Sequence, residues 1–148
     1  LNWFQKHSTY FESIMLEIPT NSINSINNTD WINCISQIGK LNNIELGYYL
    51  NTQLLKKCSK EIKKNAKKST NCEKLYLQTF QVLDSTKIKS ITFDYKVGYE
   101  AVKNNDRLKK LKWHIWHVDS IKAFEDLIRR DNTGIILLKN NKHLDNLN

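Results

Sequence analysis

The chain has 148 residues, of which 40% are hydrophobic and 26% are charged, and its formal net charge at pH 7 is +8. This composition is ordinary for a globular protein, and a chain of this length can bury about 70% of the surface that it exposes when unfolded. No stretch approaches the roughly 18 apolar residues of a membrane-spanning helix, and no basic and apolar leader opens the chain, so we expect neither a membrane protein nor a signal peptide. Because the chain begins with Leu1 rather than Met, we expect a fragment or one domain of a longer protein.

The N-terminal residues predict two helices with a loop between them. The first helix ends before Pro19, because the residue before proline avoids the α conformation. Its apolar face, at helical spacing, consists of Trp3, His7, Tyr10 and Ile14. Residues 21–29 are rich in turn formers and predict a surface loop. Asp30 can cap the second helix, whose buried face would consist of Trp31, Ile35 and Ile38.

A longer helix is predicted from Asn42 or Asn43 to Lys68. Its apolar residues fall within an arc of about 120°, and they are Ile44, Tyr48, Leu54, Leu55, Cys58 and Ile62. Seven lysines project onto the opposite arc, namely Lys56, Lys57, Lys60, Lys63, Lys64, Lys67 and Lys68. Thr70 and Glu73 then form a capping box that opens a further helix. The buried positions of that helix would be Cys72, Leu75, Thr79 and Val82.

The second half of the chain changes from helical to strand periodicity. Apolar and polar residues alternate in residues 88–99, which predicts a strand with Phe93, Tyr95 and Tyr99 facing the core. Residues 100–112 predict a loop with a helical turn. Residues 113–118 carry bulk on both faces and predict an internal strand with Trp116 in the interior. A helix over 121–128 and a short buried strand over 135–138 complete the pattern.

These elements predict an α+β fold, with helices in residues 1–83 followed by a small sheet in residues 84–148 that ends in a β-α-β unit. No linker rich in Pro, Gly or Ser separates the two halves, so we expect a single domain over residues 1–148.

The three cysteines, Cys34, Cys58 and Cys72, include no C-x-x-C spacing. An odd number leaves at least one thiol unpaired, which favours a reducing compartment over secretion. We therefore expect an intracellular protein, nuclear or cytoplasmic. Cys58 and Cys72 fall on apolar helical faces, so we expect core residues rather than nucleophiles.

The lysines carry the clearest functional pattern. Residues 56–74 hold eight lysines and two glutamates, so this segment supplies +6 of the net charge of +8. A line of cations on one helical face can follow a phosphate backbone, although lysines read no base sequence. We expect a non-enzymatic domain or subunit of a larger assembly that contacts nucleic acid or another polyanion through the seven lysines. The alternatives are a scaffold that presents the same face to an acidic protein, and a merely solvated face.

Residues 113–119 contain the only grouping that suggests catalysis. His114 and His117 are three apart on a strand, so they face opposite sides and cannot share a metal ion; we expect two buried or half-buried histidines. His117 and Asp119 share a face and could form an acid–base pair, which leaves an enzyme as a further alternative. Phosphate-binding loops, dinucleotide-binding loops and zinc-protease motifs are absent from the sequence. We accordingly expect no cofactor and no metal.

Overall fold

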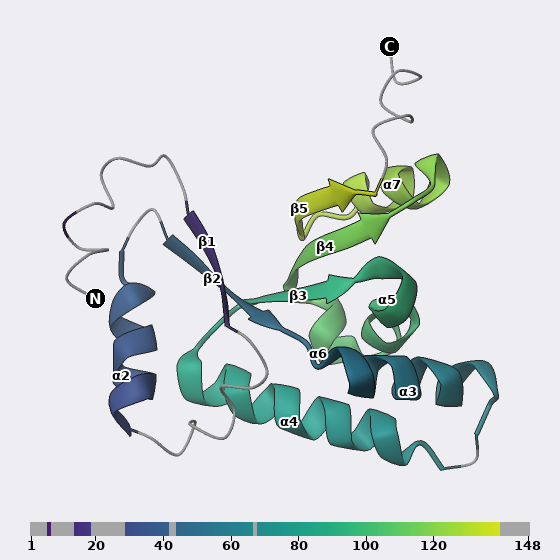
Figure 1. Cartoon of the computed structure of the whole chain (residues 1–148), viewed down its shortest axis with the longest axis horizontal. Helices are drawn as coiled ribbons and strands as arrows, with labels where there is room; N and C mark the ends of the chain where they lie inside the picture. The colour runs from purple at the N-terminus through teal and green to yellow at the C-terminus, as the bar shows by residue number, and fades with distance from the viewer. Residues whose placement is uncertain (1–5, 7–13, 19–28, 42–43, 67, 140–148) are drawn as a thin grey trace.

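The computed structural model describes residues 6, 14–18, 29–41, 44–66 and 68–139 (Figure 1). Its centre is a five-stranded sheet in which every neighbouring pair of strands is parallel. The strands pair in chain order, and they are β1 (Ile14–Ile18), β2 (Ile44–Tyr49), β3 (Ser90–Asp94), β4 (Lys112–Val118) and β5 (Thr133–Leu138).

Helices connect the strands. They are α2 (Thr29–Ile38), α3 (Thr52–Lys63), α4 (Thr70–Thr86), α5 (Tyr95–Lys103), α6 (Asp106–Lys109) and α7 (Ile121–Ile128). Strands that alternate with helices and pair only in parallel make the protein a mixed α/β structure rather than the predicted α+β one. The predicted β-α-β ending is confirmed by β4, α7 and β5.

One face of the sheet forms the core with the helices. Tyr48, Ile91 and Trp113 are neighbours across β2, β3 and β4, and each is at most 1% exposed. Helix α5 approaches this face closely at Gly98, where a Cβ atom would lie 3.0 Å from the ring of Phe93. Sequential parallel strands with right-handed crossovers carry their helices on one face, and in Figure 1 α3 and α4 lie side by side along that layer.

The alternate residues of the same strands point to the other face, which no described helix covers. This face, which we call the open face, carries Thr92 on β3, His114 and Trp116 on β4, and Ile135 and Leu137 on β5. Ile135 and Leu137 are 43% and 59% exposed. On the same face Thr92 and His114 are buried, so the internal strands β3 and β4 are covered on both sides there, as expected for the internal strand, while Trp116 is only half-buried.

The largest error of the sequence prediction lies before residue 80, where two strands were missed. Ile14–Ile18 was assigned to the first helix, and Ile44–Tyr49 to the long one, but they are β1 and β2. The rest of the first predicted helix and most of the predicted loop lie outside the described residues. The predicted second helix is confirmed as α2, and Ile35 is buried in it, but the helix begins at Thr29, so Asp30 lies within it instead of capping it.

The C-terminal half differs from the prediction at one strand end. Asp94 caps α5 by accepting a hydrogen bond from the backbone N–H of Val97, so the strand stops there and the chain turns helical. Tyr95 and Tyr99 therefore lie on a helix, although both still pack against the core as expected. The predicted strands at 113–118 and 135–138 and the helix at 121–128 are confirmed, but the last strand is partly exposed rather than buried. Within the described residues, no helix has the length and apolarity needed to cross a membrane.

Candidate functional site

Helix α3 carries most of the lysines that the sequence singled out. Asn51 caps it, and its side chain accepts hydrogen bonds of 3.1 Å from the backbone N–H groups of Gln53 and Leu54. Leu55 and Cys58 are fully buried on the face that packs against α4 and α5. Because one face of α3 is committed to the core, the opposite face meets solvent.

The solvent face of α3 holds Lys56, Lys57, Lys60 and Lys63, all exposed. Lys64 is the exposed C-cap, and Lys68 is exposed in the segment before α4. Lys67 lies outside the described residues. The helix ends at Lys63, so the prediction of one helical arc of seven lysines is wrong in its extent. We call Lys56, Lys57, Lys60, Lys63 and Lys64 the lysine surface.

The lysine surface places five lysines within nine residues of the chain. Three other described lysines form ion pairs, namely Lys96–Asp119 at 2.7 Å, Lys103–Glu100 at 2.9 Å and Lys112–Glu45 at 2.6 Å. Among the described residues, no carboxylate lies within ion-pair distance of the lysine surface. Glu61, on the same helix, instead accepts hydrogen bonds from Asn71 and from the backbone N–H of Cys72. The bond from the Asn71 side chain, together with these backbone bonds, holds the pKa of Glu61 below its ordinary value.

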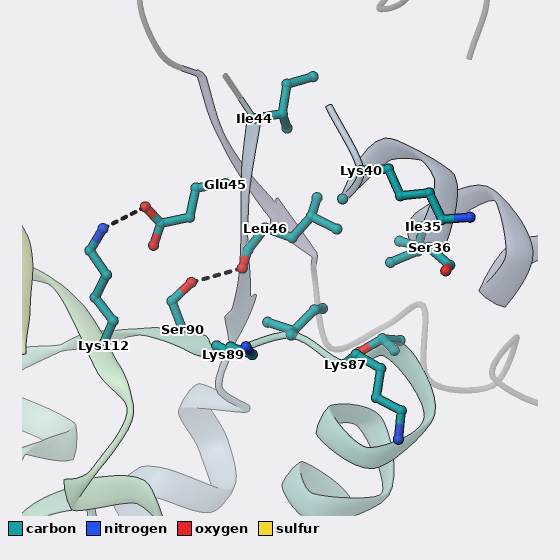
Figure 2. A pocket seen from close by; sticks show the side chains of 13 residues that line it. Ile35, Ser36, Lys40, Ile44, Glu45, Leu46, Lys87, Lys89, Ser90 and Lys112 are labelled. Carbon is teal, nitrogen blue, oxygen red and sulfur yellow. Dashed lines mark hydrogen bonds and ion pairs between the residues drawn. The ribbon is translucent and has the colours of Figure 1, made fainter. Parts of the chain in front are cut away.

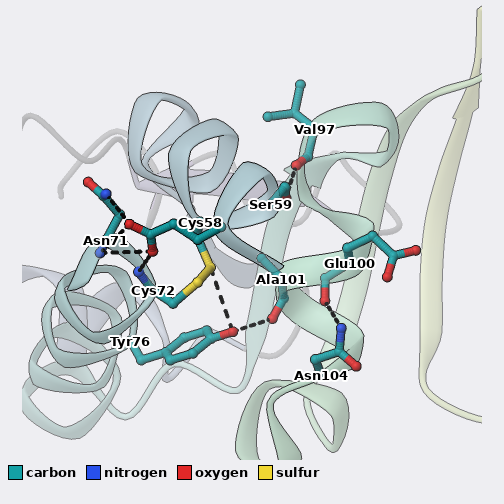
Figure 3. Close-up of a disulfide and its surroundings, with 10 residues drawn as sticks. Cys58, Ser59, Asn71, Cys72, Tyr76, Val97, Glu100, Ala101 and Asn104 are labelled. Carbon is teal, nitrogen blue, oxygen red and sulfur yellow. Dashed lines mark hydrogen bonds between the residues drawn. A yellow bond between two sulfur atoms is a disulfide. The ribbon is translucent and has the colours of Figure 1, made fainter. Parts of the chain in front are cut away.

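A disulfide fixes α3 to α4 beneath the lysine surface (Figure 3). Cys58 and Cys72 are paired with their Cα atoms 4.5 Å apart, and both are buried, as expected of core residues. The pairing itself was not predicted. Tyr76 lies beside it and donates a hydrogen bond of 2.7 Å to the carbonyl of Ala101 on α5. Cys34 remains a free, partly exposed thiol. The intracellular location stays a prediction.

A second group of polar residues lies on the open face, around His114. This side chain is 2% exposed. Its Nδ1 accepts a hydrogen bond of 3.0 Å from the backbone N–H of Ile135, so the ring proton lies on Nε2. Nε2 in turn donates to Glu45 Oε1 at 2.9 Å. The imidazole is therefore neutral and both of its nitrogens are engaged, in agreement with the expected buried strand histidine.

Glu45 on β2 binds both His114 and Lys112 on β4, across the intervening strand β3. Its second oxygen accepts from Lys112 Nζ at 2.6 Å. Burial alone would raise the pKa of Glu45, but the hydrogen bonds from Lys112 and His114 outweigh it, and the pKa is lowered from its ordinary value. The network orients the three side chains, and it leaves Glu45 as an ionised acceptor rather than a proton donor.

His117 stands at the carboxyl end of β4 and pairs with a different partner from the one predicted. Its Nδ1 lies 2.9 Å from Oδ2 of Asp94, at the end of β3. Asp119, the partner proposed from sequence, binds Lys96 instead. The His117–Asp119 pair is therefore wrong, because Lys96 on α5 takes the Asp119 carboxylate. The long-range contact between β3 and β4 left no signal in the local sequence.

The backbone of His117 explains how the ring reaches Asp94. Trp116 is the register partner of Asp94, so an extended His117 would point to the opposite face. Its φ is instead 58°, in the left-handed region that only glycine adopts freely. This turn brings the ring over Trp116, with the two ring centroids 4.2 Å apart. With Nδ1–H donating to Asp94, Nε2 is left as an exposed proton acceptor on a side chain that is 47% exposed.

A cavity of about 450 Å³ opens near the amino ends of β2 and β3 (Figure 2). Its apolar wall includes Ile35 and Leu46, and Lys40, Lys87 and Lys89 stand at its rim. Ser90 lines it, but its hydroxyl already donates to the carbonyl of Leu46 at 2.7 Å. No buried polar group of the described chain is left unpaired in this cavity, so its chemistry specifies no ligand.

In the described ranges, no three His, Cys, Asp or Glu side chains are grouped closely enough to hold a metal ion. Comparison of the chain with protein-family models, with curated proteins and with solved structures finds no match.

Proposed function

We propose that the protein binds nucleic acid through the lysine surface, holding the phosphate backbone without reading the bases. The observation that carries the proposal is the concentration of lysines. Five lysines lie within residues 56–64, all of them are exposed, and none has a carboxylate partner in the described chain. Uncompensated cations on a rigid support attract counterions and phosphates.

The spacing of the lysines fits a phosphate backbone. Lys56, Lys60 and Lys63 lie close to one line along α3 and span about 10 Å at 1.5 Å per residue. Over that length each strand of a duplex presents roughly three phosphates, at one per ~3.4 Å of axis. Lys57 and Lys64 flank this line on one side, so about four contacts at once are geometrically available. The disulfide and the packing on α5 hold α3 rigid while it makes them.

Binding of this kind depends on salt and not on sequence. With four phosphate contacts on duplex DNA, the logarithm of affinity should fall with a slope of about −3.6 against the logarithm of salt concentration. Affinity should then fall roughly 150-fold between about 50 and 200 mM salt. Fluorescence anisotropy with duplexes of unrelated sequence measures both the slope and the indifference to sequence.

The double variant Lys60→Gln/Lys63→Gln should reduce the salt slope by about 2 and weaken binding to all duplexes alike. A matched control, Lys122→Gln/Arg129→Gln, removes the same charge from exposed positions on and beside α7 and should leave the slope unchanged. If both double variants lose the same amount of affinity and salt slope, net charge alone attracts DNA, and the proposal is wrong. If the protein binds no duplex at about 50 mM salt but still binds polyglutamate, the nucleic-acid proposal is wrong. The alternative of an acidic protein partner would then take its place.

A further inference from the structure

A pocket of about 260 Å³ lies between α3 and α5, beside the lysine surface. We call it the tyrosine pocket; its lining residues are Ser59 and Lys63 on α3 and Tyr95, Lys96, Tyr99 and Glu100 on α5. Ser59 is the buried member of this lining. Its hydroxyl donates a hydrogen bond of 2.5 Å to the carbonyl of Val97 (Figure 3), which ties the two helices together beneath the pocket.

The tyrosine pocket borders the line of lysines that the proposed function uses. Lys56 lies three residues before Ser59 and Lys63 lies four residues after it, so all three share one stripe of α3. Lys60 follows Ser59 directly. A phosphate backbone that is held by Lys56, Lys60 and Lys63 therefore runs along the edge of the pocket.

The charges in the pocket leave one lysine available. Lys96 binds Asp119 at 2.7 Å, and Glu100 binds Lys103 at 2.9 Å, so each of these pairs is neutral as a whole. Lys63 has no carboxylate partner in the described chain. The pocket consequently presents a free cation at its edge and no uncompensated negative charge from its lining.

Two tyrosines of α5 supply the aromatic part of the pocket. Tyr95 and Tyr99 are one helical turn apart, their ring centroids are separated by 4.8 Å, and both side chains are half-buried. Tyr99 also contacts the ring of Trp113 and carries Nζ of Lys103 at 4.9 Å from its ring centroid. Within the described chain Tyr95 has no ring contact besides Tyr99, so Tyr95 has more aromatic surface left for a ligand.

A basic surface next to an aromatic pocket suits a single strand of nucleic acid. Proteins that bind single strands combine cations that follow the phosphates with aromatic side chains on which bases stack. The pocket has the volume of roughly nine water molecules at ~30 Å³ each, which is enough for one nucleobase. A base in a duplex is paired and must be flipped out before it can enter a pocket, whereas a single strand can turn a base aside freely.

We propose that the lysine surface and the tyrosine pocket together bind single-stranded nucleic acid, with one base packed against Tyr95 while Lys56, Lys60 and Lys63 hold the phosphates. This inference rests on the proposed function, because the same lysines hold the backbone in both. Every base has a π-face, so the pocket selects single strands over duplexes without selecting a sequence.

Three labelled DNA probes of equal length test the inference by fluorescence anisotropy. They are a single strand of mixed sequence, the same strand with abasic sites at its internal positions, and the blunt duplex. The intact strand should bind about tenfold more tightly than the abasic strand, because the two differ in their bases and not in their phosphates. With four contacts the salt slope should be about −2.8 for single strands and −3.6 for the duplex, so the preference for the single strand should grow as salt rises.

Variants of Tyr95 locate the base. Tyr95→Leu removes the ring and should lower the affinity for the intact strand about tenfold, to that of the abasic strand, with no change in salt slope. Tyr95→Phe keeps the ring and should bind as the unaltered protein does. The control is Tyr49→Leu, at a half-buried tyrosine that lines a separate cavity on the open face, and it should leave binding unchanged.

The outcomes separate this inference from the proposed function. Equal affinity for the intact and abasic strands, with duplex binding and its salt slope as expected, would overturn the tyrosine pocket and leave the lysine surface as the binding site. Loss of binding to all three probes at about 50 mM salt would overturn both. A loss of affinity in Tyr95→Leu that also appears in Tyr95→Phe, or that comes with a changed salt slope, would refute stacking on Tyr95.

Discussion

His117 and Asp94 hold one another 2.9 Å apart across the carboxyl ends of two neighbouring strands. The carboxylate serves two elements, because its other oxygen accepts the hydrogen bond from Val97 that starts α5. Asp94 thus fixes both the end of β3 and the imidazole of His117. The histidine contributes by adopting a φ of 58°, which a side chain with a Cβ atom adopts at a cost.

The left-handed backbone at His117 predicts an unusual order of stabilities. His117→Ala and His117→Gly both remove the bond to Asp94, but alanine keeps the Cβ strain while glycine relieves it. We expect the glycine variant to be more stable than the alanine variant by about 1 kcal/mol, measured by urea denaturation. In an extended or helical segment the order would be reversed, and that result would refute the left-handed conformation.

Gly134 is required by the ring of His114. A Cβ atom at this position would lie 2.6 Å from Cε1 of His114, which is buried and held by Glu45 and Ile135. Gly134→Ala should therefore lower the free energy of unfolding by about 1–3 kcal/mol. Gly39→Ala is the control, since its nearest neighbour is the flexible end of Leu46 at 3.2 Å, and it should cost less. Similar stabilities for the two variants would contradict the close approach of β5 to His114.

The two tryptophans of β4 should differ in their contribution to stability. Trp113 is 1% exposed, donates a hydrogen bond of 2.8 Å to the carbonyl of Leu108 and packs edge-on against Phe93. Trp113→Ala should cost about 3–5 kcal/mol, as expected for a large aromatic removed from the core. Trp116 is half-buried on the open face, contrary to the sequence prediction, so Trp116→Ala should cost clearly less. Thermal and urea denaturation measure both, and a larger loss at Trp116 would contradict its half-buried position.

The disulfide predicts a thiol count and a stability change. Alkylation of the unfolded, unreduced protein should modify Cys34 alone, and alkylation after reduction should modify all three cysteines, as read by mass spectrometry. A disulfide that closes a loop of this length stabilises by about 3 kcal/mol, so reduction should lower the unfolding free energy by that order. Cys34→Ser should respond to reduction as the unaltered protein does. Three reactive thiols without reductant would show that Cys58 and Cys72 are not bonded.

Glu45 predicts a pH dependence with a definite sign. Its pKa in the folded protein is lowered below the ordinary value of 4.5, although burial opposes the shift, because Lys112 and His114 donate hydrogen bonds to it. The stabilisation is therefore fully present above about pH 4.5 and is lost as the pH falls through the lower, folded-state pKa. The unaltered protein should be more stable than Glu45→Gln at neutral pH. This difference in unfolding free energy should shrink as the pH falls below the pKa of Glu45 in the folded protein. A difference that stays constant between neutral and acidic pH would contradict the network.

Elements that bury one face against the core could be predicted from the sequence. Helix α4 buries Cys72, Leu75, Thr79 and Val82, the positions that its 3.6-residue period indicated, and α7 was predicted correctly for the same reason. β4 was predicted instead from the bulky residues on both of its faces. The spacing of apolar residues shows which side of a helix or strand is buried. Where only one side is buried, that spacing can be recognised without knowing which element packs against it. The exposure of most of the lysines opposite the buried face of α3 followed in the same way.

The strand β2 and the sites on the sheet depended on contacts between distant segments. Ile44 and Tyr48 are four residues apart, a spacing that suits a helix, but with Leu46 between them it suits one face of a strand equally well. Pairing of β2 with β1 and β3 decides between the two. The same holds for His117. Alternation along the strand pairs it with Asp119, two residues away, whereas the parallel register of β3 and β4 brings it to Asp94. Spacing along the chain describes neighbours within one element, whereas the open face and its cavity arise only where several strands meet.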